Sequence, residues 1–165
     1  MIKTYVKYAF ILLLLFGGCY ADLLSKQWAK RHLKGKHEIV LVKGCVELGF
    51  TENRGMVFGI FNHDSRAQKY LSGLTVLRAL ILIVVMVFII VQRKRSILYL
   101  LPFLFIWSGA LGNLIDSVRW GHVVDFIHMH AGNALDWPFF FNVADAYVCV
   151  GMAILLLSGI FARKN

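Results

Sequence analysis

The chain has 165 residues, of which 59% are hydrophobic and 16% are charged, and its mean hydropathy is +0.67. Soluble domains of this size are about half apolar and about a quarter charged, so the composition excludes an ordinary soluble domain and predicts one polytopic membrane domain over residues 1–165. The net charge of +9 favours anionic lipid headgroups over nucleic acid as the charged partner. Three cysteines without a CxxC pair indicate neither a disulfide framework nor a zinc site.

The first apolar run, residues 8–21, follows two lysines and contains no charge. Alone it looks like a secretory signal, and Gly17-Gly18-Cys19 suggests a lipoprotein cleavage site. Against this, Phe16 stands where such a site has a small aliphatic residue, and three further apolar spans follow. A helix over about residues 5–28 is long enough to cross a hydrocarbon layer of about 30 Å. We therefore predict a transmembrane helix that is kept in the mature chain.

Two charged residues, Asp22 and Lys26, lie four apart near the end of this helix and share one of its faces. One interpretation is an ion pair at headgroup level, worth a few tenths of a kcal/mol. The other is a role in organising a functional site. The spacing alone favours neither.

Residues 29–70 are polar and rich in glycine, with short β-like runs at Glu38–Val42 and Val46–Phe50. Turn signals separate these runs, so the segment predicts a small sheet lying on the membrane surface. The stretch that follows contains Asn53 and Gly55, and glycine allows close backbone approach. A site that binds a peptide backbone needs such residues, although an ordinary turn between strands would look the same.

Three more apolar stretches follow, and we expect helices over residues 71–91, 97–116 and 139–161, with a loop over residues 117–138. The first of these stretches is apolar except for Arg78, which we expect to extend its charge to the membrane surface. Four helices place both termini on one side. The basic residues that flank the helices favour a cytoplasmic position for that side.

An asparagine and an aspartate lie three residues apart at the end of the third helix (Asn113, Asp116) and again at the start of the fourth (Asn142, Asp145). Each pair shares a helical face. Because these two helix ends lie on the same side of the membrane, the four residues can converge there with Asp125. Gly109 and Gly112 let another backbone pack close to the third helix, and Arg119 is a candidate partner for Asp116.

That pairing would leave Asp125 and Asp145 as carboxylates without an obvious cation. An ionisable side chain in a membrane segment is expensive and is by default a functional hypothesis. Two carboxylates within hydrogen-bond reach share one proton, so the charged member can act as general base on a water while the neutral member donates to a carbonyl oxygen. Asn113 and Asn142 would orient the aspartates or hold the substrate backbone.

Other interpretations remain open at this point. His122, His128 and His130 lie near Asp125, and imidazole with carboxylate binds zinc-like ions, but there is no HExxH motif and we predict no metal and no cofactor. A small transporter or proton relay would use intramembrane aspartates such as Asp145, yet it needs ionisable groups spaced through the membrane depth. A third possibility is a lipid-binding assembly factor that uses the basic loops.

Several blocks of the chain together resemble the lipoprotein signal peptidase family (signal peptidase II), aspartic peptidases of the bacterial inner membrane. The resemblance covers nearly the whole chain and rests on Asp22–Lys26, Thr51–Gly55 with Phe58–Gly59, Gly112–Asp116, Gly121–Phe126, Trp137–Pro138 and Phe141–Asp145. It implies four transmembrane helices, an extracytoplasmic β-cradle with a short periplasmic helix, and a catalytic pair at Asp125 and Asp145. It also implies cleavage of a prolipoprotein signal peptide just before a diacylglyceryl-modified cysteine, without a metal.

From this resemblance we expect a multi-pass, monomeric enzyme of the inner membrane, in contact with membrane lipids, with cytoplasmic termini and an extracytoplasmic active site. The residues expected to bind substrate or support the site are Asn53, Gly55, Asn113, Asp116, Asn142, Asp22, Lys26 and Arg119. Two positions depart from the family pattern. Ser117 stands where the family usually has arginine, a contact that Arg119 would take over, and Val57 stands where it prefers alanine.

Overall fold

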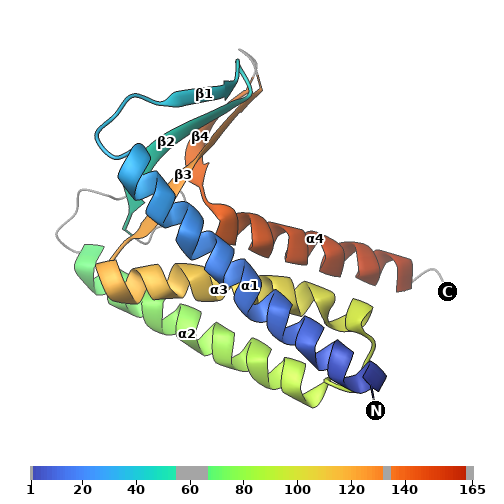
Figure 1. The fold of residues 1–165 in the computed structure, drawn as a ribbon. Helices are drawn as coiled ribbons and strands as arrows, with labels where there is room; N and C mark the ends of the chain where they lie inside the picture. Colours follow the sequence, from blue (N-terminus) through green and yellow to red (C-terminus); the bar gives the residue numbers. More distant parts are fainter. Residues whose placement is uncertain (1, 55–66, 132–134, 163–165) are drawn as a thin grey trace.

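A helical bundle with a small sheet at one end makes up the molecule (Figure 1). The computed structural model describes residues 2–54, 67–131 and 135–162. The elements in chain order are α1 (Ile2–His32), β1 (Ile39–Val42), β2 (Val46–Asn53), α2 (Ala67–Val91), α3 (Ile97–Trp120), β3 (Val123–Ala131), β4 (Leu135–Phe141) and α4 (Val143–Ala162). The chain is thus a mostly helical membrane-type protein with a small antiparallel sheet.

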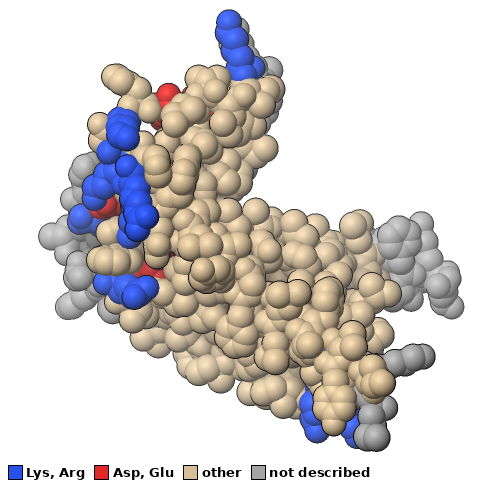
Figure 2. Space-filling view, in the orientation of Figure 1, with Lys and Arg blue, Asp and Glu red and all other residues tan. Residues whose placement is uncertain are grey.

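Three helices are long and apolar enough to cross a membrane, over Thr4–His32, Gly73–Val91 and Ile97–Trp120. Helix α4 carries a shorter apolar stretch, Val143–Gly159. On the face shown in Figure 2, lysines and arginines gather at the sheet end and at the opposite end of the bundle, and the helical surface between them is uncharged. That distribution is typical of a surface that meets lipid in its middle and water at its ends.

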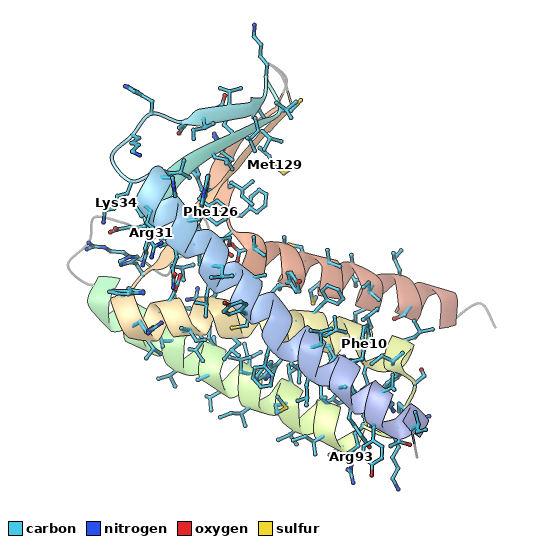
Figure 3. All side chains as sticks on the ribbon, in the orientation of Figure 1. Phe10, Arg31, Lys34, Arg93, Phe126 and Met129 are labelled. Atoms are coloured by element: carbon cyan, nitrogen blue, oxygen red, sulfur yellow. The ribbon has the colours of Figure 1, made fainter. Side chains whose placement is uncertain are left out.

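The two charged ends are marked in Figure 3 by Arg31 and Lys34 beside the sheet and by Arg93 at the far end. At the far end, the ammonium of Lys7 donates to the backbone carbonyls of Arg93 and Arg95, at 2.7 and 2.5 Å. These bonds tie the start of α1 to the turn between α2 and α3. The Lys7 ammonium thereby satisfies two backbone carbonyls in the turn that follows α2.

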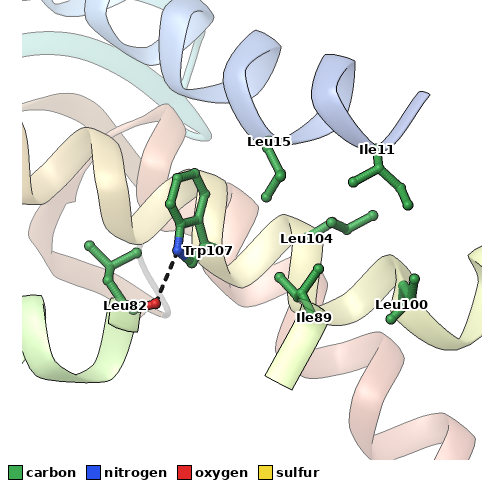
Figure 4. Close-up of a cluster of buried hydrophobic side chains, with 7 residues drawn as sticks. All are labelled: Ile11, Leu15, Leu82, Ile89, Leu100, Leu104 and Trp107. Atoms are coloured by element: carbon green, nitrogen blue, oxygen red, sulfur yellow. Dashed lines mark hydrogen bonds between the residues drawn. The ribbon is translucent and has the colours of Figure 1, made fainter. Parts of the chain in front are cut away.

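Helix α3 is the centre of the bundle and packs against the other three helices. A buried apolar cluster joins it to α1 and α2 (Figure 4), formed by Ile11, Leu15, Leu82, Ile89, Leu100, Leu104 and Trp107. The indole Nε1 of Trp107 donates to the carbonyl of Leu82 at 3.1 Å, so its polar atom is satisfied inside the cluster. On the α4 side, a side chain at Gly109 would collide with the carbonyl oxygen of Ala144, which explains the close helix packing that the sequence predicts there.

The sheet has the strand order β1-β2-β3-β4, and every neighbouring pair is antiparallel. The pairing of β2 with β3 places Thr51 opposite Asp125. Where the sheet meets the end of α1, a second buried cluster forms from Ala29, Leu33, Val124 and Phe126. The sheet is therefore anchored to the helix that also carries Asp22 and Lys26.

The segment predicted as a loop over 117–138 has a different structure. Helix α3 continues to Trp120, because no residue breaks it before Gly121, which ends it in a left-handed conformation at φ 66°. Strands β3 and β4 follow, and they join the sheet that was predicted only from residues 29–70. The run Val123–Ile127 is rich in β-branched and aromatic residues, a strand signal that its aspartate obscured.

The fourth helix also begins later than the predicted residue 139. Residues 139–141 belong to β4, and α4 starts at Val143. In addition, no separate short helix lies within residues 2–54, 67–131 and 135–162. The predicted contacts of Gly55, Val57 and Phe58–Gly59 fall outside the described residues.

Candidate active site

The first turn of α4 holds Asp145 in a reciprocal capping arrangement. The backbone N–H of Asp145 donates to Oδ1 of Asn142 at 3.0 Å, and the backbone N–H of Asn142 donates to Oδ2 of Asp145 at 3.1 Å. Asn142 is therefore the N-cap, and two orphan donors of the helix start are satisfied. Asp145 was expected several residues inside an apolar helix, but it lies in the first turn. There the positive end of the helix dipole stabilises its negative charge.

Asp125 lies on β3 beside this helix start and is 3% exposed. Its Oδ2 accepts from Nδ2 of Asn53 at 3.0 Å, and its Oδ1 accepts from Nδ2 of Asn142 at 2.5 Å. Burial, together with the negative charge of nearby Asp145, raises the pKa of Asp125 to about 7, against the opposing effect of the two amide donors. Near neutral pH this carboxyl therefore holds a proton about half of the time.

Two asparagines link the aspartates. Asn142 contacts both, and Nδ2 of Asn113 donates to Oδ1 of Asp145 at 2.8 Å. The orientation of the Asn113 amide follows from its oxygen, which accepts from Lys26 Nζ at 2.8 Å and from Asn142 Nδ2 at 3.2 Å. We call Asp125 and Asp145 the aspartate pair. Two strands, β2 and β3, and two helices, α3 and α4, thus converge on it.

A second group of charges, the lysine cluster of Asp22, Lys26 and Asp116, lies next to the aspartate pair. The ammonium of Lys26 is 2.7 Å from Asp22 Oδ2 and 3.3 Å from Asp116 Oδ2. With its bond to Asn113, each of its three N–H groups has an acceptor. Lys26 is 2% exposed and Asp22 is fully buried. The interpretation as a headgroup-level ion pair is therefore wrong, and the pair belongs to the interior of the site.

The lysine cluster also positions the backbone around the aspartate pair. Oδ1 of Asp22 accepts from the backbone N–H of Ala144 at 2.9 Å, which satisfies another free donor of the α4 start. Oδ2 of Asp116 accepts from the backbone N–H of Val124, the residue before Asp125, at 3.4 Å. A side chain at Gly112 would collide with the Asp22 carboxylate. Glycine there lets α1 approach α3 closely enough for these bonds.

The chemistry available at the aspartate pair is that of carboxyl groups and amides. Among the residues that the structure describes, neither Asp125 nor Asp145 forms an ion pair. The three nearby histidines do not gather at the pair. His128 and His130 lie with Glu47, whereas His122 Nε2 is 3.8 Å from Glu52. This arrangement fits proton sharing between two carboxyl groups.

Comparison with known proteins supplies the family. The model of the family described as signal peptidase (SPase) II matches residues 11–161. This chain belongs to the signal peptidase II family. A relative called lipoprotein signal peptidase from Clostridium novyi (strain NT) is 36% identical over 151 residues, which cover 89% of this chain and 94% of the relative. A protein of the same name from Clostridioides difficile (strain 630) is 34% identical and covers 96% of this chain and 97% of its own length.

Solved structures share the fold of this signal peptidase II chain. A structure described as a bacterial membrane enzyme superposes with a TM-score of 0.78 at 21% identity, over 95% of this chain and 91% of that one. A second structure with the same description gives a TM-score of 0.74 at 21% identity, over 91% and 92%. At this identity the likeness establishes the fold.

Ser117, where this chain departs from the signal peptidase II pattern, contacts a side chain that the sequence analysis did not predict. Arg119 is exposed, and the predicted contact with Asp116 is made by Lys26 instead. The side chain that reaches Ser117 is Arg78 of α2, whose Nη1 donates to the hydroxyl oxygen at 2.8 Å. Arg78 was expected to extend to the membrane surface. Its lone charge within an apolar helix was the signal that it has a partner inside the bundle.

Proposed function

We propose that this chain is an aspartic endopeptidase that removes the signal peptide of bacterial prolipoproteins by hydrolysing the bond before the diacylglyceryl-modified cysteine. Membership of the signal peptidase II family and relatives called lipoprotein signal peptidases support the reaction. One observation supports the catalytic type. Asn142 contacts two carboxyl groups that form no ion pair among the described residues, and one of them, Asp125, has a pKa of about 7.

In this mechanism the aspartate pair shares one proton in the resting enzyme. Asp125 carries it and Asp145 is ionised, since Asp145 lies at the positive end of α4. A water between them attacks the substrate carbonyl carbon, giving one proton to Asp145, while Asp125 donates its proton to the carbonyl oxygen. The tetrahedral intermediate then collapses: the C–N bond breaks, the leaving nitrogen takes the proton from Asp145, and one hydroxyl of the intermediate returns its proton to Asp125. Each step conserves the protons within substrate, water and two carboxyl groups.

The supporting residues have separate roles in the proposal. Asn53, Asn113 and Asn142 orient the two carboxyl groups through the bonds described above. Asp22, Lys26 and Asp116 fix the start of α4 and the residue before Asp125. Arg119 is exposed and has no role in the pair.

We further propose that the chain is a monomer of the bacterial inner membrane with four crossings, α4 being the shortest. Its termini would be cytoplasmic and the aspartate pair extracytoplasmic. The arrangement suits the substrate, because a lipid-modified peptide stays in the bilayer. Extracting its acyl chains would cost about 0.8 kcal/mol per CH₂. A site where the apolar helices meet the sheet would receive it without extraction.

Cleavage of a diacylated prolipoprotein by purified protein tests the proposal. We expect Asp125→Asn and Asp145→Asn each to lower the rate by about 10³-fold or more, because each removes a participant in general acid–base catalysis. Both variants should accumulate and insert as the wild type does. A chelator should leave the rate unchanged.

A matched control separates loss of a catalytic carboxyl from loss of any acidic residue near the sheet. Glu52 lies on β2, next to the strand that carries Asp125, and its carboxyl pairs with Lys34. The Glu52→Asn variant lacks this carboxyl and should retain cleavage. Near-normal activity in either aspartate variant would exclude the proposed mechanism. Strong inhibition by the chelator, with Tm unchanged, would assign the chemistry to a metal instead.

A further inference from the structure

The sheet carries a group of potential metal ligands apart from the aspartate pair. Glu47 on β2 and His128 and His130 on β3 each present one ligand atom, and these atoms all lie within 4.8 Å of one another. We propose that Glu47, His128 and His130 form a binding site for a divalent transition-metal ion of the Zn²⁺ type. His128 is three residues beyond Asp125 on the same strand, about 10 Å away at about 3.3 Å per residue.

The strand register brings the three side chains to one face of the sheet. Glu47 lies directly opposite His128 in the antiparallel pairing of β2 and β3. The rings of His128 and His130 have centroids 4.1 Å apart, so both histidines reach the same place although the pairing of β3 with β4 is irregular between them. The proposed site is therefore built from two paired strands, which are more rigid than a loop.

Other contacts already hold the two histidines in place. The ring of His128 stacks on Phe140 with centroids 4.6 Å apart and an interplanar angle of 20°. The backbone N–H of His130 donates to the carbonyl of Cys45 at 2.7 Å. Ligands with fixed positions lose little conformational freedom when an ion binds.

The distances suit a tetrahedral ion. Ligands about 2.0 to 2.1 Å from such an ion lie about 3.3 Å from each other. His130 Nε2 and Glu47 Oε2 are already 3.3 Å apart. All three ligand atoms lie within 4.8 Å of one another, so a small side-chain adjustment would bring the third to the same spacing.

The donor atoms of the cluster also select the kind of ion. The rings of His128 and His130 lie with centroids 4.1 Å apart, and their nitrogens are grouped with the Glu47 carboxylate. A single cation there would be bound by two imidazole nitrogens and one carboxylate oxygen. Two nitrogens and one oxygen suit Zn²⁺, Cu²⁺ or Ni²⁺ rather than Mg²⁺ or Ca²⁺.

Zinc chloride titration of the full-length protein in detergent, purified through a tag without histidine and stripped of metal, tests the proposal. We expect one Zn²⁺ per chain against a competing chelator and a rise in Tm on binding. His128→Ala and Glu47→Gln should each weaken binding by about tenfold or more. His37→Ala, which removes an exposed histidine outside the cluster, should bind as the wild type does.

Two further results bear on where the ion binds. Asp125→Asn should retain full Zn²⁺ binding, and Co²⁺ in place of Zn²⁺ should give a visible absorption band that is lost in His128→Ala. Equal binding by wild type and His128→Ala, or no binding by either, would overturn the proposal. Loss of binding in Asp125→Asn with binding kept in His128→Ala would place the ion at the aspartate pair and overturn it too.

A separate observation concerns Arg78, and the inference from it rests on the proposed function. Its Nη1 donates to Ser117 Oγ at 2.8 Å, and that hydroxyl donates to the backbone carbonyl of Asn113 at 2.8 Å. The guanidinium lies close enough to Asp125 and Asp145 to interact electrostatically with both. We infer that Arg78 is a positioning residue that partly balances the charge of the aspartate pair from α2.

The other charged groups that face the pair come from the remaining helices. Lys26 on α1 is engaged by Asp22 and Asp116, so its charge is balanced within the lysine cluster. Arg78 has a neutral bonding partner in Ser117 and keeps a net positive charge beside the pair. Arg78 therefore forms no ion pair among the described residues, and it interacts electrostatically with both carboxyl groups.

The pH profile of kcat/KM distinguishes this role from a structural one. Arg78→Gln should lower kcat/KM by about tenfold and move both limbs of the profile to higher pH, because a nearby cation stabilises ionised carboxylates. Arg78→Lys, or Arg78→Gln combined with Ser117→Arg, should restore the limbs toward their wild-type positions. An unchanged profile in Arg78→Gln overturns this inference, whereas cleavage by Asp125→Asn overturns the proposed function itself.

Discussion

Two pairs of carboxylates lie side by side in this molecule, and their partners differ. Asp22 and Asp116 share the ammonium of Lys26, at 2.7 and 3.3 Å. Asp125 and Asp145 instead receive amide and backbone N–H groups, with no ion pair among the described residues. Amides stabilise negative charge less than a cation does. The first pair is bound to a cation, whereas Asp125, with a pKa raised to about 7, can hold a proton and release it near neutral pH.

The difference suggests that the two pairs have separate roles within one buried hydrogen-bond network. A carboxylate that a cation neutralises is a rigid acceptor. Asp22 uses the oxygen that Lys26 leaves free, and Asp116 uses the same Oδ2 that faces Lys26, to accept a backbone N–H next to the aspartate pair. A carboxyl that lacks a cation can change its protonation near neutral pH, as the pKa of about 7 for Asp125 indicates. In the proposed mechanism, Asp22 and Asp116 thus position the aspartate pair.

The largest expected effect comes from removing the cation. Lys26→Met would leave the buried carboxylates of Asp22 and Asp116 without a counter-ion, and breaking a buried pair in this way costs about 3–5 kcal/mol. We expect a fall in Tm of about 10 °C in detergent and loss of cleavage. The double variant Asp22→Asn with Lys26→Met removes one of the stranded charges and should be more stable than Lys26→Met alone. A Tm of Lys26→Met equal to that of the wild type would show that the cluster is not rigidly ionised.

The second test concerns the pH dependence of stability. The folded pKa of Asp125, about 7, lies above its unfolded value of about 3.9. The stabilisation from its bound proton is therefore complete below about pH 4 and is lost as the pH rises through 7. Between pH 5 and pH 8, the Tm of the wild type should fall relative to that of Asp125→Asn, by the equivalent of a few kcal/mol at most.

Glu52 supplies a control of opposite sign for this test. Its hydrogen bond from Lys34 lowers the pKa of Glu52, so the stabilisation that it gives is present above its ordinary pKa and lost only in acid. The Tm difference between wild type and Glu52→Gln should therefore stay constant from pH 5 to pH 8. A similar decline in both comparisons would mean that the whole protein, rather than Asp125, responds to pH.

A third test separates the two roles of Asn142. Asn142→Ala loses both the N-cap and the amide donor to Asp125, and loss of a cap costs about 1 kcal/mol. Asn142→Ser keeps an oxygen for the cap but has no amide. We expect Asn142→Ser to be more stable than Asn142→Ala, while both lower kcat/KM by about tenfold to a hundredfold, a part of what acid–base catalysis contributes. Cleavage by Asn142→Ser at the wild-type rate would show that the amide is not needed at the pair.

The sequence predicted the parts of this site that depend on local spacing. Asn113 with Asp116, and Asn142 with Asp145, lie three apart and meet where two helix ends share one side of the bundle. The prediction that Gly109 lies at a close helix contact has the same origin and is confirmed by its approach to Ala144. A helical repeat determines which residues share a face, so spacing is enough.

What the sequence did not predict depends on contacts between distant segments. Strand β3 pairs with β2, and the bond between Asn53 and Asp125 joins residues 72 apart in the sequence, whereas β4 joins the sheet through β3. The cation for Asp116 is Lys26 of α1 rather than nearby Arg119, and Arg78 of α2 reaches Ser117. Charges in an apolar bundle take whichever partner the packing brings close, and one sequence does not reveal that packing.

The smallest expected effect tests whether burial determines how much a lysine–carboxylate ion pair contributes to stability. The Nζ–Oε1 distance between Lys34 and Glu52 is 2.7 Å, equal to that between Lys26 and Asp22, but the Lys34 side chain is 61% exposed and that of Lys26 is 2% exposed. Water and salt screen the outer pair, so Lys34→Met should change stability by about 0–1 kcal/mol. The measurement is the Tm at low and at high salt, beside Lys26→Met. A loss for Lys34→Met as large as that for Lys26→Met would mean that distance, and not removal from water, determines what a lysine contributes here.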